Sequence, residues 1–90
     1  MKKELLAKAV SALKASGASE VFIFGSVANG NEHKGSDIDI AVSGIPPEKF
    51  IKAMGDTADI LKKPLDLVDL DDDTAFTRYL KKEKELKRVG

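Results

Sequence analysis

The sequence predicts a small α/β domain, equally describable as α+β, in which helices pack on one face of a mixed sheet of three or four strands. Two observations predict it. Helical and strand-like apolar patterns alternate along the chain, and glycine, proline or polar clusters separate them. The chain of 90 residues with 42% apolar content suits one hydrophobic core, so residues 1–90 are expected to form a single domain.

The first part of the chain reads as a helix, a strand and a loop. Residues 3–16 place apolar side chains at helical spacing between lysines and glutamate, and Gly17 supplies a left-handed stop. Residues 20–24, EVFIF, are β-branched and aromatic, which is typical of a central strand buried on both faces. A short turn capped by Ser26 and a polar loop at 30–35 are expected next.

The second strand is expected within residues 36–42, SDIDIAV, whose side chains alternate in character. Because successive strand residues point to opposite faces, the alternation separates an apolar face from an acidic one. The apolar face consists of Ile38, Ile40 and Val42, and the acidic face carries Asp37 and Asp39.

The rest of the chain predicts a helix, a strand and a final helix. Pro46 and Pro47 suit the first turn of the helix, which runs to Leu61. Its expected apolar face is Phe50, Ile51, Met54, Ala58 and Leu61. Residues 65–70, LDLVDL, form the third strand, and the aspartates at 71–73 suit the start of a helix over residues 73–87. Phe76, Tyr79, Leu80 and Leu86 give that helix its apolar side.

Composition excludes several kinds of partner and site. Fifteen basic residues balance fifteen acidic ones, so no overall field attracts nucleic acid. The absence of cysteine removes disulfides and thiolate metal sites and fits the cytoplasm. No segment approaches the roughly 20 apolar residues of a membrane span, so no membrane association is expected.

The paired aspartates are the first candidate for chemistry. Asp37 and Asp39 lie two residues apart on one strand face, roughly 6.6 Å from each other, and can converge on one cation. Two carboxylates so placed repel unless a cation neutralises them, and oxygen ligands without cysteine favour Mg²⁺ over zinc. Taken alone, this pattern is better explained as the solvated face of an edge strand, and its position relative to Gly25 and Ser26 favours the functional interpretation.

A phosphate site is expected just upstream of the aspartates. Gly25 and Ser26 follow a buried strand, where backbone amides and the serine hydroxyl can cradle a triphosphate, and Lys34 can meet phosphate charge. A third carboxylate would complete a two-metal site. Asp66 and Asp69 have opposite parity on the third strand, so only one can face the pair, and parity alone does not choose between them.

At this point the residues resemble a known family. Gly25 and Ser26, ten intervening residues, then Asp37, Ile38 and Asp39 resemble the signature of the DNA polymerase β nucleotidyltransferase superfamily. The short length and the later LDLV strand are similar to its minimal members, the MntA-type antitoxins that are often paired with HEPN-domain toxins. The resemblance covers nearly the whole chain.

The resemblance implies a small nucleotidyltransferase fold, two Mg²⁺ ions and ATP as substrate. It implies that Gly25 and Ser26 hold phosphate and that Asp37, Asp39 and Asp66 bind the metals and carry catalysis. In similar proteins AMP moves to a hydroxyl, notably a tyrosine of a HEPN toxin. One departure is Asn29, where many relatives have arginine, because an amide stabilises phosphate charge less than a guanidinium does.

That departure keeps a second hypothesis open, in which the chain neutralises a HEPN partner by contact with weak or absent chemistry. A third is nucleotidyl transfer to a small molecule. The acceptor, the preferred nucleotide and the oligomeric state are not determined by the sequence.

Overall fold

The protein is a four-stranded sheet with three helices in the part of the chain that the structure, a computed structural model, describes: residues 3–25, 38–83 and 86–90. The elements in chain order are α1 (Lys3–Ala15), β1 (Glu20–Phe24), β2 (Ile38–Ser43), α3 (Pro47–Leu61), β3 (Leu65–Asp69), α4 (Ala75–Lys82) and β4 (Lys87–Arg88). None of these helices has the length and apolar character needed to cross a bilayer.

The strands lie in the order β3-β2-β1-β4. β1 is antiparallel to both of its neighbours, β2 and β4, whereas β2 and β3 are parallel. α3 connects the parallel pair, as a parallel connection requires a crossover. The mixed sheet and the central place of β1 confirm the predicted fold class.

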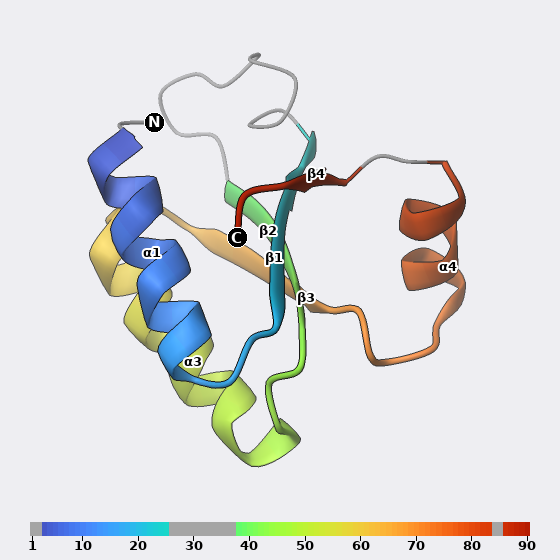
Figure 1. Cartoon of the computed structure of the whole chain (residues 1–90), viewed down its shortest axis with the longest axis horizontal. Helices are drawn as coiled ribbons and strands as arrows, with labels where there is room; N and C mark the ends of the chain where they lie inside the picture. Colours follow the sequence, from blue (N-terminus) through green and yellow to red (C-terminus); the bar gives the residue numbers. More distant parts are fainter. Residues whose placement is uncertain (1–2, 26–37, 84–85) are drawn as a thin grey trace.

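α1 and α3 cover one face of the sheet, on the left in Figure 1. The predicted parity of β2 is confirmed, because Ile38, Ile40 and Val42 point to this face and are fully buried. The other fully buried residues of this core are Ala9, Leu13 and Val21. Burying these side chains removes apolar surface from water, the main favourable term in folding.

α4 lies on the opposite face of the sheet (Figure 1). Leu80 of α4 packs in a second, smaller core with Phe24, Ala41 and Leu70. The prediction that helices pack on one face therefore holds for α1 and α3 but not for α4. The sequence could not assign α4 to a face, because its amphipathic pattern says only that one side is buried.

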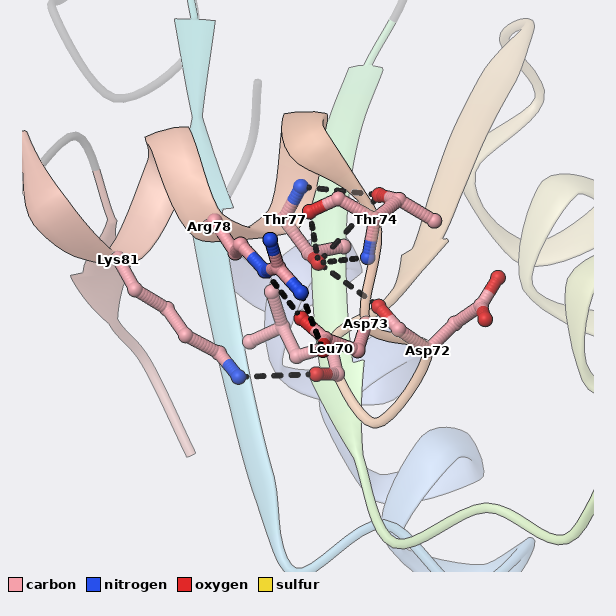
Figure 2. A network of polar contacts seen from close by, with 7 residues as sticks. All are labelled: Leu70, Asp72, Asp73, Thr74, Thr77, Arg78 and Lys81. Carbon is pink, nitrogen blue, oxygen red and sulfur yellow. Dashed lines mark hydrogen bonds and ion pairs between the residues drawn. The ribbon is translucent and has the colours of Figure 1, made fainter.

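A network of polar contacts marks the start of α4 and joins the helix to the segment after β3 (Figure 2). Thr74 and Thr77 form a reciprocal capping box, with the Thr74 hydroxyl accepting from the Thr77 amide at 3.1 Å and the Thr77 hydroxyl from the Thr74 amide at 3.0 Å. Arg78 donates two hydrogen bonds of 2.7 Å to Asp73. Further along the helix, Lys81 Nζ donates to the Leu70 carbonyl at 3.0 Å.

Three expectations about the helices were wrong. The helix predicted over residues 73–87 ends at Lys82, because Lys87 and Arg88 instead pair with β1 as an edge strand. Its N-cap is Thr74 and not one of the aspartates at 71–73. In α3, Ile51 was assigned to the apolar face but is 73% exposed, while Ala53 and Thr57 are buried.

Candidate active site

Three residues form a row across the sheet at the end of β1. Asp66 of β3 is paired in register with Asp39 of β2, and Asp39 is paired in register with Phe24 of β1. Side chains at paired positions project from the same face, and neighbouring strands lie about 4.8 Å apart. The two carboxylates are therefore neighbours on the α4 face, beside the aromatic ring of Phe24.

The burial of this row falls steadily toward the edge of the sheet. Phe24 is 7% exposed, Asp39 is half-buried and Asp66 is exposed. Asp66 has no hydrogen-bond or ion-pair partner among residues 3–25, 38–83 and 86–90. The exposed Asp66 carboxylate therefore has oxygen atoms available to a ligand, whereas Asp39 already takes part in an interaction.

The backbone of Gly25, at the end of β1, lies close to the Asp39 carboxylate. Its φ of 70° lies in the left-handed region, which side chains other than glycine adopt only with strain. A Cβ at this position would collide with Asp39 Oδ2 and lie 3.3 Å from Asp39 Cγ. Glycine thus lets the backbone turn and approach the carboxylate.

The register decides which aspartate of β3 shares a face with Asp39. Asp66 is the partner of Asp39, whereas Asp69 is the partner of Val42, whose side chain lies in the α1 and α3 core. Asp69 Oδ1 instead accepts a hydrogen bond from the Asp71 amide at 2.9 Å, which closes the turn after the strand. The structure therefore brings Asp66, not Asp69, to the candidate site.

Several predicted site features lie outside the described residues. They are the turn at Ser26, Asn29, the loop at 30–35 with Lys34, and Asp37. Within the described part, no group of three or more histidine, cysteine, aspartate or glutamate side chains is arranged to hold a metal ion. The predicted set of three includes Asp37, so the described part contains only two of its members.

The two described carboxylates fit the chemistry of Mg²⁺. Magnesium is commonly bound by one or two carboxylates and completes its shell with water and substrate phosphates. Asp39 and Asp66 supply such a pair on one face of the sheet. The backbone of Gly25 lies directly against the Asp39 carboxylate at this end of the sheet. The pair can accordingly hold a cation that carries a phosphorylated substrate.

A second acidic cluster lies at the other end of the sheet and has its partners within the protein. Asp71 accepts hydrogen bonds from Ser43 Oγ at 2.6 Å and from the Gly44 amide at 2.7 Å. The Ser43 hydrogen bond is the main cause that lowers the pKa of the Asp71 carboxyl, with the Gly44 bond next. Asp71 therefore joins the end of β2 to the segment after β3 and is structural.

Phe24 and Phe76 were assigned to apolar packing, and sequence reasoning missed that Phe24 lies next to Asp39 and that Phe76 packs on Phe24. Their rings meet edge to face, with centroids 6.1 Å apart. The β1–β2 register that places Phe24 next to Asp39 is a long-range property, so no local pattern could have revealed it.

A pocket elsewhere on the molecule does not share this chemistry. It has a volume of about 300 Å³ and lies on the α1 side, away from Asp39 and Asp66. Its lining is Lys3, Leu6, Ala7, Val10 and Val89.

The four-stranded mixed sheet with its three described helices matches the small nucleotidyltransferase fold, the class of protein that the sequence predicts. The family model of polymerase beta nucleotidyltransferases matches residues 8–87, so the chain belongs to this family. The resemblance found in the sequence is thereby confirmed.

Solved structures share the fold at low sequence identity. A toxin–antitoxin structure with AMP-PNP has a TM-score of 0.75 and 24% identity, over 98% of this chain and 72% of that chain. A minimal nucleotidyltransferase has a TM-score of 0.75 and 22% identity, and the match covers 97% of this chain and 94% of that chain.

A third structure, tri-AMPylated Shewanella oneidensis HEPN toxin in complex with MNT antitoxin, has a TM-score of 0.71 and 22% identity, over 98% and 71%. At these identities the likeness establishes the fold. No curated protein matches the sequence.

Proposed function

We propose that this protein is a Mg²⁺-dependent nucleotidyltransferase that moves AMP from ATP to a hydroxyl group, with a tyrosine of a HEPN toxin as acceptor. The observation that carries the proposal is the in-register pair Asp39 and Asp66 beside the close approach of Gly25. The similarity to a structure with AMP-PNP supports ATP as donor. The similarity to an AMPylated HEPN toxin in complex with an MNT antitoxin supports the acceptor and an antitoxin role.

In the proposed reaction the acceptor oxygen attacks the α-phosphorus of ATP. A new bond forms between that oxygen and phosphorus, the bond from the α-phosphorus to the bridging oxygen breaks, and pyrophosphate leaves. Asp66, exposed at the edge of the row, takes the proton of the acceptor hydroxyl. Gly25 and Ser26 hold and orient the triphosphate through backbone amides and the serine hydroxyl, with Lys34 near the phosphate charge.

Asp37, Asp39 and Asp66 are the residues proposed to hold two Mg²⁺ ions, which when bound would neutralise the triphosphate and the leaving pyrophosphate. The half-buried position of Asp39 suits this task, because reduced water access strengthens its interaction with a cation.

The test measures transfer of label from α-³²P-ATP to a purified HEPN partner in the presence of Mg²⁺. The wild-type chain is expected to label the partner, and mass spectrometry to place the AMP on a tyrosine. The Asp37→Ala, Asp39→Ala double variant should lose the transfer. Asp59→Ala is the matched control, because it removes an exposed carboxylate from α3 on the other face of the sheet. If the double variant labels the partner as strongly as the wild type does, the proposal is wrong.

The contact hypothesis is separated from this one by a growth assay. If the folded double variant no longer labels the partner but still protects cells from it, neutralisation occurs by binding. If protection is lost together with labelling while the two proteins still associate, the chemistry is responsible.

A further inference from the structure

Phe76 on α4 is a large, half-exposed apolar side chain that packs on Phe24, the strand neighbour of Asp39. It is 48% exposed, although its helix is otherwise anchored by buried Thr77 and Leu80. Its ring contacts that of Phe24 at 6.1 Å with an interplanar angle of 62°. Since Phe24 is paired with Asp39, a single side chain separates the exposed ring from the candidate metal ligands.

The exposed ring is held in place on two sides. The edge-to-face contact with Phe24 is a preferred aromatic geometry. The packing of buried Leu80 and the Lys81 hydrogen bond to the Leu70 carbonyl hold α4 against the sheet (Figure 2). A rigid apolar surface loses little conformational freedom when a flat ligand covers it.

We propose that Phe76 is the stacking surface for the nucleobase of the bound nucleoside triphosphate, an inference that rests on the proposed function. A nucleotide has an anionic end and a flat aromatic end. The structure offers groups that match both ends. Asp66 and Asp39 are acidic neighbours on the sheet, Phe24 follows them on β1, and the exposed ring of Phe76 on α4 packs on Phe24. With the phosphates at the carboxylates, the nucleoside extends along the row toward α4.

The mode of contact predicts the specificity. Stacking on an aromatic ring uses the π face that every base possesses and does not read hydrogen-bonding groups. Phe76 would therefore bind adenine and guanine comparably and would contribute nothing to a triphosphate that lacks a base.

The experiment measures equilibrium binding to the full chain by calorimetry with Mg²⁺. The probes are the α,β-methylene analogues of ATP and GTP, and ribose 5-triphosphate, which has no base. Phe76→Leu keeps an apolar contact with Phe24 but removes the π face, and Phe76→Trp enlarges it. Ile51→Ala is the matched control, because it removes an exposed apolar side chain from α3 on the opposite face. Thermal melts establish that each variant is folded.

Phe76→Leu is expected to weaken both nucleotide analogues about tenfold, within the range of base–aromatic stacking, and to leave ribose 5-triphosphate unchanged. Phe76→Trp should bind the nucleotides as tightly as the wild type or more tightly. Ile51→Ala should change nothing. Equal weakening of all three probes in Phe76→Leu, or weakening of none, overturns the inference.

The two proposals fail in distinguishable ways. If the wild type binds none of the triphosphates, both fall. If the Asp37→Ala, Asp39→Ala variant loses transfer but Phe76→Leu binds nucleotide normally, the proposed function stands and the stacking role alone is wrong. If Phe76→Leu binds the nucleotides normally but transfers AMP to the partner more slowly, the stacking role is wrong and Phe76 instead contacts the acceptor.

Discussion

The two ends of the sheet both carry aspartates, yet the structure treats them differently. At one end Asp71 accepts hydrogen bonds from Ser43 and from the Gly44 amide, within the protein. At the other end Asp66 is exposed and has no such partner among the described residues, and it stands in register with Asp39. The comparison teaches that acidic content does not identify a site. A carboxylate satisfied by its own chain stabilises the fold, and one left accessible beside another is available for a ligand.

The largest expected effect is a difference in AMP transfer between substitutions at the two ends of the sheet. Asp66→Asn is expected to lower AMP transfer by about 100-fold or more, because an amide neither binds Mg²⁺ well nor accepts the acceptor proton. Asp71→Asn should leave transfer within about twofold of wild type, since loss of charge at that end touches no reacting group. The check is the initial rate of label transfer by both variants. Equal losses would remove the distinction between the two ends.

Gly25→Ala should combine a loss of stability with a loss of activity. The left-handed φ of 70° and the collision with Asp39 predict a decrease in the free energy of unfolding of about 1–3 kcal/mol. Displacement of the Asp39 carboxylate should also slow transfer. Gly55→Ala is the matched control, because a Cβ there meets open space within helix α3 and should raise stability by about 0.5–1 kcal/mol. Urea unfolding of both variants measures the difference.

The structural role of Asp71 predicts a dependence on pH. Its pKa is lowered in the folded protein, so its stabilising contribution is present above the pKa of the unfolded chain and is lost as the pH falls through the folded pKa. At pH 7, Asp71→Asn should reduce the free energy of unfolding by about 0.5–1 kcal/mol, a range reduced for solvent exposure. The gap between variant and wild type should close on acidification below roughly pH 4. A gap that stays constant would contradict the assignment.

The smallest effect is expected at Arg78. Its two hydrogen bonds to Asp73 lie in solvent, where salt screens the charges. Arg78→Gln should lower the melting temperature slightly at low salt and not at all at high salt. Melting curves at the two salt concentrations provide the measurement, and a large drop that persists in high salt would show that Arg78 does more than pair with Asp73.

Patterns read from neighbouring residues predicted most of the fold. α1, β1 and α3 begin and end within a few residues of the expected positions, because local periodicity and the punctuation by Gly17 and Pro46 determine them. β4 was predicted as helix because its charged residues have no strand pattern of their own. They adopt strand conformation by pairing with β1. Long-range pairing leaves no mark on a two-residue segment.

The candidate site was predicted in outline and not in detail. The alternation in β2 placed Asp39 opposite the core, but the choice between Asp66 and Asp69 needed either the family resemblance or the register of β2 with β3. Ile51 was misassigned because helical spacing alone leaves several neighbouring residues compatible with the buried face. Packing against the sheet decides which of them is buried. The roles of Gly25, Asp39 and Asp66, and those of Ser26, Lys34 and Asp37, stay predictions.

The shortest element of the fold also protects it from aggregation. Residues 21–24 of β1 are uncharged, β-branched or aromatic, the kind of segment that pairs with other chains when its edge is open. β4 and the residues after it cover that edge, with hydrogen bonds from the Val21 amide to the Gly90 carbonyl at 3.1 Å and from the Val89 amide to the Val21 carbonyl at 2.9 Å. The new edge is only two residues long and carries two cations, which repel a second copy of the same strand. A segment that the sequence predicts as the end of a helix thus covers the edge of β1 along Val21, Phe22 and Ile23.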